Sequence, residues 1–313
     1  MSSNNNNVYG MTGKFEAEPM CVVTVQFGPI SAASIDDVNE NTQTLCEWID
    51  RAVAGYPNLD LLVTTECAFQ GFGPGWKNSL ISIDGPQLQR VKDKAKEYKI
   101  WIICNPVLDE LEGHKACNTC LMINPEGEIV HKYVKWNPWV PGEPTYPGWM
   151  MPVTPGPKGS RIATIICYDG DFPEMFRQAR LAGANVIVRT SHAMAPVEDV
   201  WELTNRTAAY CNQCYVVAAN SVGTDECYTY FGRSLVAGPD GNLIVEAATG
   251  INWITKADIL PTYIDYLAEK APCGSFLYAV QHRSSAHPET KGVGADMRDL
   301  LITKPADFKY LGK

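Results

Sequence analysis

Residues Arg161–Arg180 read RIATIICYDGDFPEMFRQAR, and this stretch contains the transition that decides the fold. A short apolar run ends at Cys167, and a tight polar turn follows it. Pro173 suits the first turn of a helix, and Asp171 with Glu174 has the spacing of a capping box. The stretch therefore predicts a strand, a sharp turn and a helix, with a thiol at the carboxyl end of the strand.

The position of Cys167 is compatible with two roles. Reacting groups collect at the carboxyl ends of strands in an α/β sheet. A thiol held there, near backbone N–H groups and a helix N-terminus, can act as a nucleophile. Free cysteine is also among the most buried residue types, so a structural place in the core is the alternative.

The composition bounds the class of protein. With 313 residues, 45% hydrophobic and 19% charged, the chain is of ordinary globular type and long enough for one large α/β domain or two small ones. The net charge of −9 argues against a nucleic-acid or anionic-membrane partner, and no apolar run approaches the roughly 18 residues of a membrane span. Eleven cysteines without a signal peptide indicate free thiols in the reducing cytoplasm.

Strand and helix patterns alternate along the chain. The first half predicts a strand, helix, strand, helix and strand, followed by a hairpin, at Val22–Phe27, Ser34–Ala54, Leu59–Thr64, Pro86–Tyr98, Ile100–Cys104 and Thr119–Tyr133. After the Cys167 turn the second half predicts a strand, helix, strand and hairpin at Asn185–Arg189, Val197–Cys211, Tyr215–Ala219 and Ser234–Ala247. The two halves thus share one order of elements.

Three ionisable residues lie just past the ends of different predicted strands, namely Glu66, Lys135 and Cys167. A cysteine hydrolase needs such a set, because a thiol with a pKa near 8.5 requires a base and a carboxylate can serve as one. A fixed ammonium and the backbone N–H of Tyr168 can stabilise the oxyanion. Spacing alone leaves structural roles open for all three: a cap, a solvated loop charge and a core thiol.

Longer segments around these residues carry a resemblance. They read VTTECAFQGF, NPEGEIVHKYVKWNPWVPGEPTYPG and ICYDGDFPEMFRQARLAGANVIVRTS, and WELTNRTAAYCNQCYVVAAN follows. From Cys21 to Arg283 the chain resembles the nitrilase (carbon–nitrogen hydrolase) superfamily, and within it the aliphatic amidase and formamidase branch.

The resemblance implies an α/β fold, a four-layer α-β-β-α sandwich with a C-terminal oligomerisation arm. We expect a disordered tail over residues 1–17, the hydrolase domain over 18–270 and the arm over 271–313. The part of the arm containing His282-Arg283 resembles the segment through which this branch forms homo-oligomers, built from dimers and often hexameric.

The resemblance also implies roles for individual residues. Glu66 corresponds to the general base, Lys135 to the oxyanion stabiliser and Cys167 to the nucleophile. Glu143 corresponds to a second glutamate that helps hold the amide nitrogen, and Trp139 to a pocket wall. The implied substrates are a small aliphatic primary amide and water, and the products a carboxylate and ammonia, by way of a thioester and without cofactor or metal.

The chain departs from the branch at positions near the expected site. Cys67 replaces a tyrosine, Thr145 replaces a tryptophan, and His192-Ala193 replaces Gly-Tyr. Losing aromatic side chains frees volume, so we expect the substrate to carry a larger acyl group than formyl. The alternative is that Trp76 or Trp149 refills the space. His192 either contacts a polar substrate group or is a structural residue.

Other functions stay open at this point. The pairs Cys117–Cys120 and Cys211–Cys214 have the C-x-x-C spacing of zinc ligands, although the superfamily implies no such metal. Metal analysis finding about one zinc per chain would overturn the expectation of no metal. Within the superfamily, nitrile hydrolysis, N-carbamoyl hydrolysis and acyl transfer are alternatives, and a non-catalytic relative is a further one.

Overall fold

The computed structural model describes residues 17–140 and 142–270. The predicted C-terminal arm, and the predicted N-terminal tail apart from its last residue, lie outside the described residues. Among the described residues, no helix combines the length and the apolar character that crossing a membrane requires.

The first sheet has seven strands in the order β15-β1-β2-β3-β5-β4, with β6 beside β5. Strands β1, β2 and β3 run parallel, and β15 adds antiparallel to β1. Their bounds are β1 Met20–Gln26, β2 Leu61–Val63, β3 Trp101–Cys104, β4 Val107–Leu111, β5 His114–Ile123, β6 Ile129–Val134 and β15 Trp253–Ile259.

The second sheet has six strands in the order β14-β13-β10-β9-β8-β7, and its centre β8-β9-β10 is parallel. Its strands are β7 Thr154–Pro155, β8 Arg161–Ile166, β9 Val186–Ser191, β10 Tyr215–Asn220, β13 Leu235–Ala237 and β14 Leu243–Glu246. A separate ribbon pairs β11 (Val222–Thr224) with β12 (Thr229–Phe231). Short 3-10 turns occupy η2 (Trp76–Asn78), η3 (Pro157–Gly159) and η4 (Cys167–Asp171).

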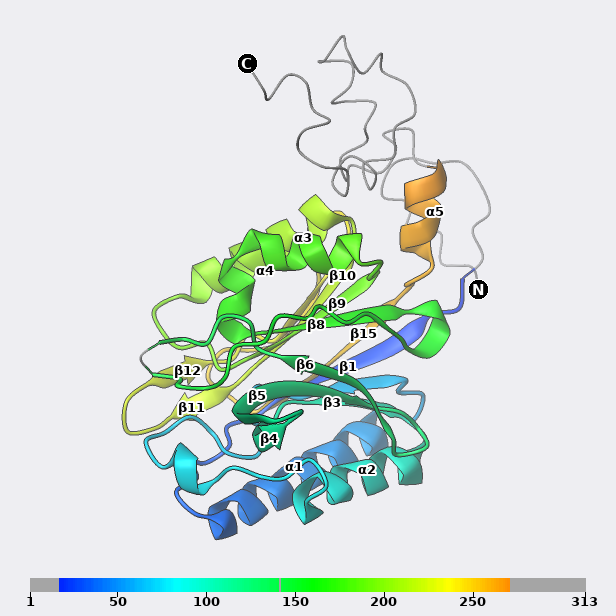
Figure 1. The fold of residues 1–313 in the computed structure, drawn as a ribbon. Helices are drawn as coiled ribbons and strands as arrows, with labels where there is room; N and C mark the ends of the chain where they lie inside the picture. The colour runs from blue at the N-terminus through cyan, green and yellow to red at the C-terminus, as the bar shows by residue number, and fades with distance from the viewer. Residues whose placement is uncertain (1–16, 141, 271–313) are drawn as a thin grey trace, which may run out of the picture.

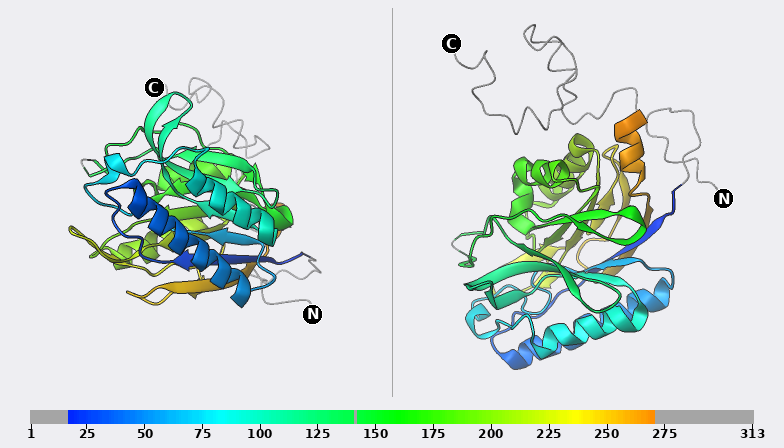
Figure 2. Two further views of the ribbon diagram at one scale, coloured as in Figure 1. Left: turned by 90° about the horizontal axis from the view of Figure 1, so that it is seen from below. Right: turned by 45° about the vertical axis from the view of Figure 1, so that its right-hand side comes forward.

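Helices cover the outer face of each sheet (Figure 1). The first sheet is covered by α1 (Ile35–Gly55) and α2 (Pro86–Tyr98), which lie side by side in the view from below (Figure 2). The second is covered by α3 (Pro173–Leu181) and α4 (Glu198–Asn212). The sheets face each other, since β1 contacts β10 and β5 contacts β8. The predicted α-β-β-α sandwich is confirmed, and α5 (Tyr263–Lys270) follows it.

Helix α1 shows how local sequence sets an element. Ser34 caps its N-terminus, where the Ser34 hydroxyl accepts from the backbone N–H of Asp37 and the Asp37 carboxylate accepts from that of Ser34. This reciprocal pair satisfies amide groups that have no partner within the helix. Val38, Leu45 and Ile49 follow at helical spacing and are buried against the first sheet.

The capping box predicted for α3 is wrong. The helix begins at Pro173 with Phe172 as its N-cap, and no side chain caps it. Asp171 is instead the last residue of η4, and its Oδ1 lies 3.1 Å from Nη2 of Arg189 on β9. An arginine brought in from another strand thus takes the carboxylate that local spacing assigned to the helix.

Candidate active site

The ends of three strands converge on one cavity of about 280 Å³. Glu66 lies three residues beyond β2, and Lys135 directly follows β6 in the same sheet. Cys167 directly follows β8 in the second sheet. The side chains of all three line this cavity, so the structure brings together groups that are far apart along the chain.

Lys135 lies between two carboxylates in the interior. Its Nζ is 2.9 Å from Oε1 of Glu66 and 2.5 Å from Oε2 of Glu143, while the Lys135 and Glu66 side chains are only 1% and 2% exposed. Burial by itself lowers the pKa of Lys135, but the two carboxylates outweigh burial and hold it well above the ordinary value. Burial likewise raises the pKa of Glu66, and the Lys135 charge reverses this, so the net shift is downward. Lys135 is therefore a permanent cation at neutral pH.

Asn118 on β5 holds both glutamates and was not predicted from the sequence. Its Nδ2 donates to Oε1 of Glu66 at 2.8 Å and to Oε1 of Glu143 at 2.5 Å. In the sequence, Asn118 is marked only by its position between Cys117 and Cys120, and the C-x-x-C spacing of that pair was interpreted in terms of zinc ligands. Oε2 of Glu66 accepts no hydrogen bond from any described residue, so this oxygen is available as a base.

Cys167 begins the η4 turn in the left-handed region, with φ at +46°. A residue other than glycine rarely adopts this backbone conformation unless the surrounding structure holds it there. Burial and, to a lesser extent, the Glu66 charge raise the pKa of the Cys167 thiol to about 12, although the Lys135 charge opposes the shift. The thiol is therefore protonated at neutral pH, and it needs a base at the moment of attack.

Arg189 fixes the turn that presents Cys167. Its Nε and Nη2 donate to the Cys167 carbonyl at 3.0 and 2.6 Å. The guanidinium also lies over the Trp201 ring, 4.8 Å from its centroid. Gly170 makes room for this group, because a Cβ on Gly170 would lie 2.1 Å from Cζ of Arg189.

We expect Gly170→Ala to lower the free energy of unfolding by about 1–3 kcal/mol through overpacking. Because the arginine must then leave the Cys167 carbonyl, kcat should fall on the order of 10²-fold. Denaturant unfolding and steady-state kinetics check this. Gly55→Ala at the end of α1 is the matched control, since nothing lies within 4 Å of a Cβ there. Equal effects of the two variants would contradict the role assigned to Gly170.

Asp169 joins the two loops of the site and was also missed. Its Oδ2 accepts from the Tyr133 hydroxyl at 2.7 Å and from the Ile166 backbone at 3.1 Å. Its Oδ1 accepts from the backbone and side chain of Asn137, two residues after Lys135. Burial raises the pKa of Asp169, and these bonds oppose the shift. One buried carboxylate thus connects the nucleophile turn, which is η4 after β8 of the second sheet, to the lysine loop, which contains Lys135 and Asn137 after β6 of the first sheet.

The residues predicted to bind substrate divide between two cavities. Trp139, Tyr168, His192 and Ala193 line the cavity that contains Cys167. Cys67 and Thr145 instead line a neighbouring cavity of about 220 Å³. The prediction placed all six around one pocket; the division arises because other side chains stand between the two spaces.

Trp76 and Trp149 were the two candidates for refilling the space left by the missing aromatic side chains. Trp149 packs edge-on against His114 and Tyr146 and is exposed, so it does not refill either cavity. The side chain of Trp76 lies outside the described residues.

His192 is held by its Nδ1. This atom lies 3.0 Å from the backbone carbonyl of Glu66 and 2.7 Å from the Ser221 hydroxyl. A carbonyl only accepts, so we assign the proton to Nδ1. Burial lowers the pKa of His192, which keeps the ring neutral. Its Nε2 has no protein partner in the described part of the chain, so a hydrogen-bond acceptor remains at the cavity wall.

None of the four cysteines of the two C-x-x-C pairs lines the catalytic cavity. Cys117 and Cys120 are buried on β5, Cys214 is buried before β10, and Cys211 is exposed near the end of α4. Over residues 17–140 and 142–270, no group of three or more His, Cys, Asp or Glu side chains is arranged to hold a metal ion.

Residues 22–266 match the family model of the carbon-nitrogen hydrolases. The chain belongs to this family. The carbon–nitrogen hydrolase is 35% identical over 268 residues to a formamidase of Photorhabdus laumondii, a match covering 83% of this chain and 79% of the relative. It is also 35% identical over 233 residues to a formamidase of Bacillus cereus, covering 73% and 70% of the two chains.

Solved structures share the fold of this carbon–nitrogen hydrolase. Saccharomyces cerevisiae Nit3, of the nitrilase superfamily, superposes with a TM-score of 0.72 at 23% identity, covering 84% of this chain and 97% of the other. An amidase from Nesterenkonia superposes with a TM-score of 0.70 at 22% identity, covering 87% and 98%. The predicted membership of the nitrilase superfamily, and with it a hydrolase of carbon–nitrogen bonds, is confirmed.

Proposed function

We propose that this carbon–nitrogen hydrolase cleaves a small aliphatic primary amide to a carboxylate and ammonia, with a thioester on Cys167 as the intermediate. The observation that carries the proposal is the buried Lys135, held by Glu66 and Glu143 at the cavity that Cys167 also lines. A structural ion pair has no need of a thiol beside it, whereas amide cleavage needs all of these groups. No cofactor enters the proposed reaction.

The first half of the reaction forms the thioester. Glu66 takes the thiol proton through its unpartnered Oε2 as Sγ of Cys167 attacks the amide carbonyl carbon. Lys135 and the backbone N–H of Tyr168 stabilise the oxyanion. The protonated Glu66 then gives its proton to the departing nitrogen, the C–N bond breaks, and ammonia leaves.

The second half releases the acid. Glu66 removes a proton from water, which attacks the thioester carbonyl; the second tetrahedral intermediate collapses with cleavage of the C–S bond, and the protonated Glu66 returns its proton to the Cys167 sulfur. Glu143 stands beside Lys135, and both of its oxygens accept hydrogen bonds, from Lys135 and Trp139 on one side and Asn118 and Thr145 on the other. It orients the ammonium and presents a fixed negative charge to the amide N–H.

The acyl group that fits best is larger than formyl. A cavity of about 280 Å³ with Trp139 and Ala193 in its wall leaves much of its volume empty around formamide, so few contacts would hold that substrate. The relatives named formamidase make the formyl group the competing choice.

A series of linear amides tests the acyl preference. We expect kcat/KM to rise from formamide to butyramide by at least about tenfold, because each buried methylene contributes about 0.8 kcal/mol. Steady-state ammonia release is the measurement. Formamide as the best substrate would reject the larger acyl group and leave amide hydrolysis intact.

Parallel experiments distinguish amide hydrolysis from alternatives left open by the sequence. Ammonia release from a nitrile panel, or from N-carbamoyl amides, exceeding that from amides would favour another reaction of the superfamily. The mass of an acyl adduct on Cys167 after rapid quenching identifies the nucleophile and the acyl group together. Absence of any turnover or adduct would favour a non-catalytic relative.

Assembly into homo-oligomers and location in the cytoplasm stay predictions from the sequence.

A further inference from the structure

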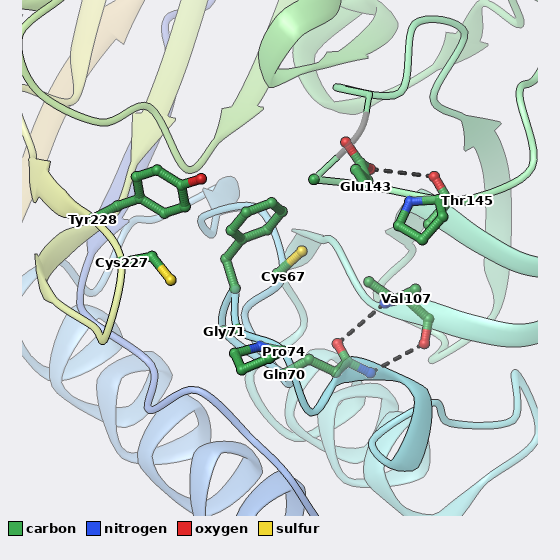
Figure 3. Close-up of a pocket in the computed structure, with 13 residues that line it drawn as sticks. Cys67, Gln70, Gly71, Pro74, Val107, Glu143, Thr145, Cys227 and Tyr228 are labelled. Carbon is green, nitrogen blue, oxygen red and sulfur yellow. Dashed lines mark hydrogen bonds between the residues drawn. The ribbon is translucent and has the colours of Figure 1, made fainter.

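A second cavity of about 220 Å³ lies beside the catalytic one. Figure 3 shows Tyr228 and Cys227 on one side of it and Val107 with Thr145 on the other. Apolar groups make up most of its wall. Cys67 and Thr145, which line part of it, have small side chains that leave this space unfilled.

The second cavity adjoins the catalytic cavity. Phe72 and Glu143 line both, so these two side chains form the shared wall. The Phe72 ring contacts Trp139 on the catalytic side and Tyr228 on the other, with centroids 6.2 Å apart in each case.

The backbone around Phe72 is held firmly in this position. Gly71 has a φ of +64°, and a Cβ there would lie 2.4 Å from the carbonyl oxygen of Ile30. Gln70 is anchored on β4, since its side chain donates to the carbonyl of Val107 and accepts from its N–H, both at 3.1 Å. The shared wall is therefore a built feature of the fold.

We infer that the second cavity binds the far end of the substrate's acyl chain, so that the preferred substrates are unbranched amides longer than butyramide. This inference rests on the proposed function. Because the proposed reaction releases ammonia, the nitrogen carries no chain, and only the acyl group can extend past Phe72. The largely apolar wall favours methylene groups, and its carboxylate, Glu143, already accepts hydrogen bonds from Asn118 and Lys135.

The expected gain follows from burial of the chain. Each methylene moved from water into an apolar site strengthens binding by roughly fourfold. Three methylenes seated in the second cavity should therefore raise kcat/KM by roughly 50-fold over an amide that ends in the catalytic cavity. We compare hexanamide with acetamide.

Cys227→Trp tests the inference by filling the cavity from its exposed rim. We expect the ratio of kcat/KM for hexanamide to that for acetamide to fall at least about tenfold, as the loss of two buried methylenes predicts. Cys211→Trp is the matched control: it makes the same exchange at another exposed cysteine, and Cys211 lines neither cavity. Equal ratios in the two variants would overturn the inference.

A second variant works in the opposite direction from the facing wall. Val107→Ala on β4 enlarges the cavity, and we expect the preferred chain to lengthen by one or two methylenes. N-butylacetamide carries a four-carbon chain on nitrogen, and a Cys227→Trp effect confined to that compound would assign the cavity to the leaving group and overturn the inference.

These experiments distinguish a failure of the acyl-chain inference from a failure of the proposed amide hydrolysis. Turnover of acetamide by the unmodified protein reports on amide hydrolysis alone. If acetamide and hexanamide are both inert, the proposed function fails and takes this inference with it. If acetamide is hydrolysed and neither variant changes chain-length preference, only the second cavity's role is overturned.

Discussion

Cys167→Ala is expected to lower kcat/KM for the best amide by at least about 10⁴-fold, because the proposed mechanism has no second nucleophile. The described structure supports this singular role, since Cys167 is the one thiol in the wall of the cavity that Glu66 and Lys135 line. Ammonia release under single-turnover and steady-state conditions measures the loss. Calorimetry on the variant should still detect amide binding, since the oxyanion donors and cavity walls remain.

Two further variants serve as controls for the Cys167→Ala measurement. Cys67→Ala removes the thiol beside Glu66 that lines only the second cavity, and it should retain adduct formation on Cys167. Cys167→Ser keeps a hydroxyl, whose much higher pKa should leave it nearly inactive at neutral pH. Activity of Cys167→Ala within tenfold of the unmodified protein would reject the thioester mechanism.

Lys135→Met should lower the free energy of unfolding at pH 7 by about 3–5 kcal/mol, since it leaves two buried carboxylates without their cation. Glu66 and Glu143 both lose a direct ion pair within 3 Å in this change. The same substitution removes the oxyanion donor, which should reduce kcat by a further factor on the order of 10²–10³. Denaturant titration and kinetics measure the two losses independently.

In the Lys135→Met variant the free energy of unfolding should depend on pH with the opposite sign to that in the unmodified protein. In the unmodified protein the folded-state pKa of Glu66 is lowered, so its stabilisation is present above the unfolded value near 4.3 and is lost as the pH falls through the folded pKa. Without Lys135, its charge no longer opposes the effect of burial, and the pKa of Glu66 rises above its ordinary value. The folded variant then binds protons more readily than the unfolded chain, and acidification from pH 7 stabilises it. The stability gap between the two proteins should therefore narrow as the pH falls towards about 4.5.

Lys132→Met is the matched control. Lys132 lies on β6, three residues before Lys135, is exposed, and its Nζ is 3.8 Å from Oε1 of the exposed Glu112. Such a pair contributes about 0–1 kcal/mol, so the control should unfold like the unmodified protein at every pH. A Lys135→Met protein with unchanged stability at pH 7 would mean that the carboxylates are solvated or protonated, against the arrangement described.

Most elements were predictable from local pattern. The alternation of apolar runs with amphipathic stretches set the strands and helices of both halves, and Ser34 with Asp37 correctly marked the start of α1. The antiparallel β15 and the ribbon β11–β12 were not predicted. Strand β15 is at the far end of the domain and pairs with β1, a partner more than two hundred residues away, so nothing within its own segment identified it.

The sequence by itself determined the chemistry available to this protein: a thiol after a strand, a carboxylate and an ammonium at other strand ends, and the motifs that place the chain among the carbon–nitrogen hydrolases. Only the tertiary structure decided which groups act on one another. Asn118 joins Glu66 to Glu143, Asp169 joins the nucleophile turn to the lysine loop, and Phe72 divides the space into two cavities. The physical reason is that hydrogen bonds, desolvation and cavity walls depend on distances in space, and packing the two sheets face to face brings these residues together from every part of the chain.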